Sequence, residues 1–454
     1  GSRTGMVLLV STASELSIDG VVYDFSAFDH PGGDSISLFG GQDATIQYKM
    51  IHPHHNFQSS KSSNSGSASS KTASMHLSKM KQTGILEGYQ EEYTFESQFA
   101  LELKEEVFKI VKRNQQFGTY GFFFRAFCFM TIFFYLQYLW VFQGSSIWLA
   151  IAYGVAAGAI GTSVQHDANH GAASRYPWVN EVLGYMNDIL GNPKILWMQQ
   201  HWTHHAHTND VSRDPDSAGA EPVLLFYNYP KDSSKRQWYH AFQGYYLFAV
   251  LSGFWAALFF SLDFSTLLKG SVKDKFRNDT KYIQNHYWVV QAVHLYYRLT
   301  FVLPPFLHHG WLSWQPFVHI SFFAVSVSLY LGMLFTLSHN FEGVEESDLS
   351  QETVSASGKK EPICWYARQV ETSSTYGGLI SGWITGGLNL QIEHHLFPRM
   401  SSAWYPYIAP TVRRVCAKHN VRYTHFPWIW QNMISTIRRV SMVGNNTSLK
   451  QKES

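Results

Sequence analysis

The sequence predicts a mainly α-helical, multi-span membrane protein with about four transmembrane helices, a histidine-rich cytosolic cap and a small amino-terminal α+β domain. Three observations predict it. Four apolar stretches are long enough to cross a bilayer, only 15% of the residues are charged while 16% are aromatic, and the 22 histidines include three tight motifs. The mean hydropathy of −0.16 is too polar for a chain lying wholly in lipid, so a soluble part is also expected.

The soluble part is predicted at the amino-terminal end. Residues 6–55 combine short apolar runs with glycine turns at Gly32-Gly33 and Gly40-Gly41, which is typical of a small folded domain. Residues 1–5 read as an appended segment ahead of Met6. The apolar run after Met6 is too short for a signal peptide, so this end is expected in the cytosol.

A linker and the membrane domain are predicted next. Residues 56–93 are assigned to the linker because 56–74 consist mostly of Ser, Lys, Asn, Gly and Ala, which cannot bury enough apolar surface to fold. Residues 94–454 are assigned to the membrane domain. Its first segment, 94–113, has apolar residues at helical spacing and is expected to be an amphipathic helix on the bilayer surface.

Four spans are predicted, at residues 121–142, 146–164, 244–262 and 316–338. Residues 288–307 are also apolar, but they carry His294 and Arg298 and end in Pro304-Pro305. Charge is costly in lipid and proline interrupts a helix, so this segment is expected to be re-entrant or interfacial. Basic residues before the first and third spans predict a cytosolic side for both.

Three histidine motifs are the main functional signal. They read HDANH at 166–170, HWTHH at 201–205 and QIEHH at 391–395. Spacings of three and four residues place side chains on one helical face, and imidazole is a good ligand for transition metals. Three such motifs are hard to explain by packing, because each buried imidazole needs a polar partner. His339 ends the last span and is a further candidate ligand.

The order of spans and motifs supports convergence. The first two motifs lie between the second and third spans, and the third motif follows the fourth span, so two crossings separate them and all three face the same side. Counting 288–307 as an additional span would put the third motif on the opposite face. Other histidines have ordinary expectations: His207 lies outside the HWTHH pattern, and the rest are expected to be structural or exposed (His308, His309, His319, His419 and His425).

The amino-terminal domain has a haem-type pattern. His30-Pro31-Gly32-Gly33 sits in a turn, Asp43-Ala44-Thr45 follows, and histidines come again at 52, 54 and 55. Two histidines from facing segments can fill both axial positions of a haem iron, which leaves electron transfer as its function. This pattern resembles the cytochrome b5 fold. His30 is the first expected axial ligand, and His52 is favoured over His54 and His55 as the second.

Together, the motifs resemble those of membrane front-end fatty-acid desaturases, which carry such a haem domain at this end. The segments that carry the likeness, most similar to microalgal Δ5 enzymes, are QQHWTHH (199–205), SHNF (338–341), QVETSSTYGG (369–378) and GGLNLQIEHHLFPRM (386–400). The resemblance implies two non-haem irons held by His166, His170, His201, His204, His205, His339, His394 and His395. Related desaturases have histidine where Gln391 stands, so Gln391 is expected to ligate weakly, hold a water or shape the acyl channel.

The resemblance also implies the reaction. O2 would be the co-substrate, a cis double bond at Δ5 of a C20 polyunsaturated acyl chain the product, and acyl lipid or acyl-CoA the substrate. Electrons would come from NADH through NADH-cytochrome b5 reductase to haem b and on to iron, at the endoplasmic reticulum membrane, with the linker letting the haem domain reach the metal face.

The sequence leaves some residue roles and some functions open. Asp167 and Glu393 are either acceptors that orient imidazoles or surface carboxylates, and Trp197, Trp202 and Trp383 either line an acyl tunnel or pack in the core. The alternatives to Δ5 are a Δ4, Δ6 or Δ8 desaturase, including sphingolipid enzymes, and a hydroxylase or acetylenase of the same group. A haem membrane protein without catalysis is the alternative from another class. A net charge of +2 gives no reason to expect nucleic acid as a partner.

Overall fold

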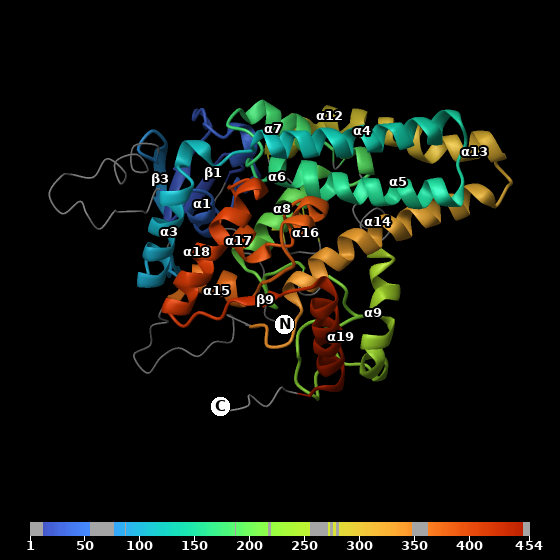
Figure 1. Cartoon of the computed structure of the whole chain (residues 1–454). Coiled ribbons are helices and arrows are strands. Elements are labelled where there is room, and N and C mark those ends of the chain that lie inside the picture. Colours follow the sequence, from blue (N-terminus) through green and yellow to red (C-terminus); the bar gives the residue numbers. More distant parts are fainter. Residues whose placement is uncertain are drawn as a thin grey trace.

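The computed structural model describes residues 12–54, 77–86, 88–186, 188–216, 219–254, 271–272, 276–277, 281–346 and 362–447. A small mixed domain, blue in Figure 1, packs on one end of a long helical bundle, and a cap of shorter helices completes that end. The predicted fold class, mainly helical with a small α+β domain, is therefore observed. The proposed tail at residues 1–5 lies outside the described residues.

The amino-terminal domain is built on an antiparallel sheet in the order β1-β2-β3, formed by Glu15–Ile18, Val21–Asp24 and Lys81–Ile85. The β1–β2 connection is Asp19-Gly20, and both residues have positive φ, as a two-residue hairpin turn requires. A 3-10 helix, Gly33–Phe39, and α1, Thr45–Ile51, lie beside the sheet. Their apolar side chains enclose a small core (Leu16, Ile18, Tyr23, Phe25, Ala44 and Met80).

The predicted boundary at residue 55 is wrong, because β3 lies inside the segment assigned to the linker and pairs with β2. Met80 belongs to the domain's core, and Leu86 packs on Val22. β3 does not show the alternation of buried and exposed residues by which a strand is recognised in a sequence, because all five of its residues are exposed. Residues 55–76, the serine-rich part of the predicted linker, lie outside the described residues.

The bundle contains α4 (Tyr120–Phe142), α5 (Ile147–Ile160) and α14 (Gln315–His339). Within the described residues, three helices are long and apolar enough to cross a membrane: Arg113–Phe142, Ile147–Asn169 and Gln315–His339. They match three of the four predicted spans. α5 packs against both α4 and α14, with Tyr153 and Phe323 in ring contact at 5.1 Å.

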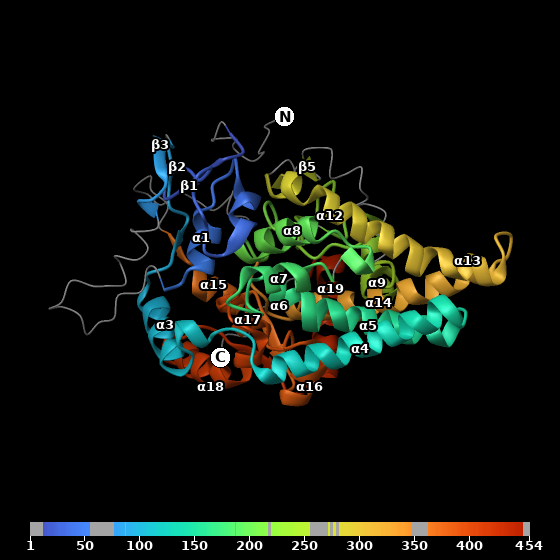
Figure 2. The ribbon, with the colours of Figure 1, turned by 90° about the horizontal axis from the view of Figure 1, so that it is seen from above.

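The segment predicted to be re-entrant or interfacial is helical and packs along the bundle. α12 (Lys281–Tyr297), a π-helical turn (Arg298–Val302) and α13 (Leu303–His309) form one continuous helical path. Trp140 Nε1 donates to the Phe301 carbonyl oxygen at 2.9 Å, and His308 Nε2 lies 2.8 Å from the Val141 carbonyl oxygen. Figure 2 shows α12 and α13 heading to the same end as α4. Pro304 and Pro305 are tolerated because they open α13.

The predicted third span, 244–262, is described only as far as residue 254. Its helix, α9 (Gln243–Leu251), ends after nine residues and packs against α14 and α19 (Ile429–Asn445). The Gln243 side-chain amide donates to the carbonyl oxygens of Leu225 and Val440, which fixes α9 to neighbouring protein. Residues 255–262 lie outside the described residues.

The cap gathers α3 (Gln98–Ile110), α15 (Trp365–Glu371), α16 (Leu379–Thr385), α17 (Gln391–Leu396) and α18 (Tyr405–Lys418). The helix predicted at 94–113 forms, with Ser97 Oγ accepting from the Ala100 N–H at its start. The prediction that this helix lies on the bilayer surface is wrong. The apolar face of α3, with Leu103 and Val107 fully buried, packs against α18 and α15.

Candidate metal centre and haem cavity

Three short backbone segments bring the histidine motifs together. α5 ends in a π-helical turn, Gly161–Gln165, which leads directly into α6, His166–Asn169. The second motif lies on α8, Lys194–Ala206, and the third on α17. Gly386, just before α17, has φ +72°, and a Cβ there would lie 2.4 Å from the Thr162 carbonyl oxygen. Only glycine therefore lets the third motif approach the first so closely.

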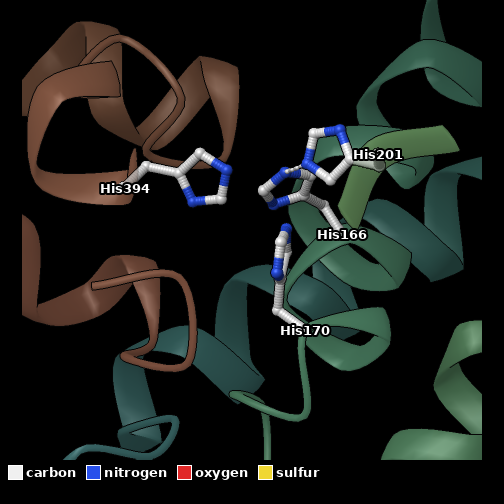
Figure 3. A group of neighbouring side chains, drawn as sticks. All are labelled: His166, His170, His201 and His394. Atoms are coloured by element: carbon white, nitrogen blue, oxygen red, sulfur yellow. Dashed lines mark hydrogen bonds between the residues drawn. The ribbon is translucent and has the colours of Figure 1, made fainter. Parts of the chain in front are cut away.

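One group of imidazoles, here called the first cluster, consists of His166, His170, His201 and His394. Their candidate ligand atoms all lie within 4.8 Å of one another. His166 Nε2 and His201 Nε2 are 3.2 Å apart, and Figure 3 shows His394 facing the other three from across the site. All four side chains are buried.

A second group, the second cluster, consists of His204, His339 and His395. His204 Nε2 lies 3.4 Å from His339 Nε2. Gln391 joins this group, with its amide nitrogen 3.2 Å from His339 Nε2. His205 lies between the clusters, because its Nε2 is 3.1 Å from His201 Nε2 while its ring stacks on His395 at 4.1 Å.

The donor set fits two metal ions. Nitrogens bound about 2 Å from one ion lie roughly 3 Å from each other, which is the spacing seen within each cluster. Both nitrogens of His170, and the Nε2 atoms of His394 and His395, are buried without a hydrogen-bond partner in the described part of the chain. Burial, and then neighbouring imidazoles, hold the pKa values of His201 and His394 well below the usual range. Both are therefore neutral, the form that binds metal.

Several acceptors that the sequence interpretation missed hold these imidazoles in place. The Asp214 carboxylate lies 2.9 and 3.0 Å from His204 Nδ1, the Thr372 carbonyl oxygen 3.0 Å from His339 Nδ1, and Gln369 Oε1 2.8 Å from His395 Nδ1. Accepting the Nδ1–H leaves Nε2 to face the metal. Although burial opposes it, Asp214 raises the pKa of His204 to about 9. Asp214 could be suspected only from its place ten residues after a motif.

Asp167 and Glu393 are both buried, so neither is a surface carboxylate, yet neither hydrogen-bonds an imidazole among the described residues. Asp167 Oδ2 accepts from Ser401 Oγ and from the backbone N–H and hydroxyl of Ser402, and it lies 3.9 Å from His166 Nδ1 through its other oxygen. Glu393 accepts from Tyr423 at 2.8 Å. Burial raises the pKa of Glu393 to about 7.

The three tryptophans suggested for an acyl tunnel have different surroundings. Trp197 stacks on His201 with 4.4 Å between ring centroids. Trp383 lies on α16 and is half exposed. Trp202 is buried beside His170 and faces the amino-terminal domain. His207, as expected, belongs to neither cluster, and it lies beside Tyr93.

The amino-terminal domain brings His30 and His52 together, with ring centroids 6.2 Å apart and the ring planes perpendicular. Two imidazoles that each bind one iron at about 2 Å would have their centroids roughly this far apart. His52 Nδ1 lies 2.9 Å from the Tyr48 carbonyl oxygen, which leaves Nε2 toward His30. His54 instead stacks on Phe108 of α3 at 3.9 Å, and His55 lies outside the described residues.

A cavity of about 420 Å³ lies between these two histidines and extends to the cap. The amino-terminal domain supplies a mostly apolar wall that includes Leu16, Phe28 and Phe39, as a porphyrin requires. The end of α6 and helix α8 supply the opposite wall, which includes His170 and Trp202. Gly33 of the HPGG turn has φ +78°, and a Cβ there would lie 3.0 Å from Pro177 in α7, Pro177–Gly184, so the two domains meet closely here.

Comparisons with known proteins agree with this construction. Residues 138–427 match the fatty acid desaturase family, and residues 14–93 match the cytochrome b5-like heme/steroid binding domain. The chain is 32% identical to the acyl-lipid (7-3)-desaturase of Rebecca salina, covering 97% of this chain and 93% of the relative. It is also 32% identical to the acyl-lipid (7-3)-desaturase of Diacronema lutheri, over 96% and 92% of the two chains.

Identity to Delta(5) fatty acid desaturase A of Dictyostelium discoideum is 26%, over 96% of this chain and 92% of that one. The desaturase match covers more than half of the sequence, and the haem-domain match includes β3, in agreement with its place in the sheet. The chain is therefore an oxidoreductase that belongs to the fatty acid desaturase family and carries an amino-terminal cytochrome b5-like domain.

Proposed function

We propose that this chain inserts a cis double bond at Δ5 of C20 polyunsaturated fatty-acyl chains, using O2 and electrons delivered through its own haem. The observation that carries the proposal is the pairing of two buried imidazole clusters with a haem cavity that extends to the first of them. Hydrogen removal from unactivated methylenes needs a metal oxidant, and a haem with two axial histidines can pass electrons but has no open position for O2.

In this proposal His166, His170, His201 and His394 hold one iron, and His204, His339 and His395 hold the other. His205 lies between them, and Gln391 contributes to the second site. When bound, the two irons supply the oxidising power for desaturation. The protein's own part is to hold imidazoles at fixed spacing and to exclude water, since every histidine of the two clusters is at most 6% exposed. His30 and His52 are the proposed axial ligands of the haem. Metal analysis should find about two non-haem irons per haem.

The proposed membrane arrangement has four crossings, by α4, α5, the α12–α13 path and α14. It is supported by contacts at the far end of the bundle, where His309 Nε2 lies 3.1 Å from the Ser145 carbonyl oxygen and Ser145 Oγ 2.8 Å from His319 Nδ1. The α4–α5 hairpin and the α13–α14 hairpin therefore turn at the same end of the bundle. In this arrangement all three histidine motifs lie at the opposite end, as a shared metal site requires. We place this side in the cytosol at the endoplasmic reticulum, where NADH-cytochrome b5 reductase would reduce the haem.

The bond position is tested by expression in yeast that lacks polyunsaturated acids. Cells fed dihomo-γ-linolenic or eicosatetraenoic acid should form the Δ5 product, identified by mass spectrometry of derivatives that locate double bonds. A His204→Ala variant is the matched negative control. Desaturation of neither acid at Δ5 would contradict the regiochemistry.

A second candidate is the reaction designated (7-3), because the two relatives with this name are 32% identical to the chain while the Delta(5) enzyme is 26% identical. The same feeding series, extended to polyunsaturated acids of other chain lengths, distinguishes the two by product. The same cells also identify the acyl carrier. If the desaturated product of a labelled fatty acid is found first in phospholipid, the substrate is acyl lipid rather than acyl-CoA.

A further inference from the structure

Trp202 lies where the haem cavity meets the metal centre. It belongs to α8, between His201 and His204, and its side chain lines the cavity. Its ring centroid is 6.2 Å from Phe39 of the amino-terminal domain and 5.4 Å from His170 of the first cluster. The indole is 5% exposed, and its Nε1 has no hydrogen-bond partner in the described part of the chain. The indole therefore spans the boundary between the two domains.

The two clusters are not equally close to the haem. Of the seven histidines assigned to them, His170 is the one that lines the haem cavity in the described part of the molecule. His204, His339 and His395 are not among the described residues that line the cavity: His339 contacts His204 and the Thr372 carbonyl oxygen, and His395 contacts Gln369 of α15. Trp202 and His170 thus both line the haem cavity, and the two rings also contact each other.

We propose that Trp202 is the bridge through which haem electrons reach the metal ion of the first cluster, entering at His170. The inference rests on the proposed function. Electron transfer rates fall steeply with distance through saturated groups, and an aromatic ring in contact with both partners provides a shorter path. In each transfer Trp202 passes one electron without net change, ferrous haem becomes ferric, and one ferric ion of the first cluster becomes ferrous.

The electrons and protons of these transfers balance those that desaturation requires. Two such transfers, with two protons from solvent and two hydrogen atoms from the acyl chain, reduce one O2 to two water molecules. The donor that reduces the haem again is a reduced flavoprotein or an equivalent one-electron reductant. His205 lies between the clusters and is placed to connect the second ion to the first.

Trp197 is a matched control in the same helix. It also contacts first-cluster imidazoles, with His201 at 4.4 Å and His166 at 5.6 Å, but it does not line the haem cavity. Loss of an indole beside the metal is therefore common to Trp197→Leu and Trp202→Leu. Loss of the contact with the haem side is specific to Trp202.

The experiment measures electron transfer directly, with the full-length protein in lipid nanodiscs, loaded with haem and ferric iron and kept free of O2. A laser flash photoreduces the haem, and its absorbance follows reoxidation. Trp202→Leu should slow reoxidation roughly tenfold, Trp202→Phe less, and Trp197→Leu should stay within about twofold of the wild type. The haem spectrum, haem reduction potential and iron content should be unchanged in the variants.

Reoxidation in Trp202→Leu at the wild-type rate, with haem and iron intact, would overturn the inference and leave the proposed function standing. If Trp202→Leu loses iron, the haem reoxidation rate is measured in Phe39→Leu instead, because Phe39 contacts the same indole from the amino-terminal domain. Slowing in Phe39→Leu supports the bridge, and an unchanged rate in both Phe39→Leu and Trp202→Phe overturns it. Absence of any reoxidation in the iron-loaded wild type would overturn the proposed function together with the bridge.

Discussion

The first and second clusters differ in what supports their imidazoles. In the second cluster, His204 contacts the Asp214 carboxylate, and His339 and His395 contact a carbonyl oxygen and an amide oxygen. In the first cluster, His166 Nδ1 and His170 Nδ1 have no hydrogen-bond partner among the described residues, and His394 Nδ1 lies 3.1 Å from the Tyr405 hydroxyl. The imidazoles of the second cluster are therefore held by anionic and carbonyl acceptors, and those of the first cluster mainly by packing.

This difference assigns separate tasks to the two halves. A carboxylate that accepts from a ligating imidazole increases its basicity and fixes its orientation, so the second cluster should hold its ion more firmly. The first cluster lies next to the haem cavity and should accept electrons first, while releasing its ion more readily to a chelator.

The largest effect should come from removing one ligand in each half. His170→Ala and His395→Ala should each lower desaturation by about 100-fold or more, because each leaves one ion without a complete set of imidazoles. Iron per haem should fall from about two to about one in both variants. Fatty-acid analysis in yeast and metal analysis of the purified protein measure the two quantities.

The two variants should differ in flash photoreduction. His395→Ala keeps the first cluster and should still reoxidise the haem, whereas His170→Ala removes the entry point and should not. Equal behaviour of the two variants would contradict the assigned order of electron entry.

A smaller effect is expected from the outer carboxylates. Asp214→Asn should lower iron retention and activity by roughly 10- to 100-fold, because His204 loses its anionic acceptor. Asp167→Asn is the matched change in the first motif, where the carboxylate binds Ser401 and Ser402 rather than an imidazole. It should keep both irons and instead lower the free energy of unfolding by about 1–3 kcal/mol. Chelator competition and thermal unfolding separate the outcomes, and iron loss in Asp167→Asn alone would reverse the comparison.

The sequence was sufficient for features that depend on local spacing. The three motifs, His339, and three spans could be placed because helical periodicity and apolar length are local properties. The α12–α13 path was predicted to be re-entrant or interfacial because His294 and Arg298 are costly in lipid, and the partner that His294 has in the fold could not be seen from the sequence. In the structure His294 Nε2 lies 3.4 Å from the buried carboxylate of Asp188, a partner more than a hundred residues away in the chain.

Other features depend on contacts that no local pattern carries. β3 has no buried residue of its own, so its membership of the amino-terminal sheet is visible only from its pairing with β2. Asp214 and Tyr405 support imidazoles across loops, and their roles required the folded chain. The grouping of the imidazoles also cuts across the motifs, since His394 joins His166, His170 and His201, the adjacent His395 joins His204 and His339, and both also lie close to His205.

Gln391 gives the next smaller effect, within the second cluster. Its amide nitrogen lies 3.2 Å from His339 Nε2, at a position where an imidazole would also reach the metal. Gln391→His should therefore keep desaturation within about threefold of the wild type, while Gln391→Leu should lower it roughly tenfold by replacing the polar group beside the second site with an apolar one. Full activity of Gln391→Leu in yeast would show that the amide has no part in the second site.

The smallest effect should come from Tyr405, the neutral counterpart of Asp214. Its hydroxyl donates to the Met400 carbonyl oxygen at 2.8 Å and is thereby oriented to accept from His394 Nδ1. Tyr405→Phe removes both of these hydrogen bonds, and loss of the one to His394, worth about 1 kcal/mol, should lower iron retention in the first cluster by roughly fivefold. Tyr423→Phe is the matched control, because its hydroxyl binds Glu393 and no imidazole. A loss in Tyr405→Phe as large as that in Asp214→Asn would mean that the two clusters are supported equally, because a neutral hydroxyl would then hold its imidazole as firmly as a carboxylate does.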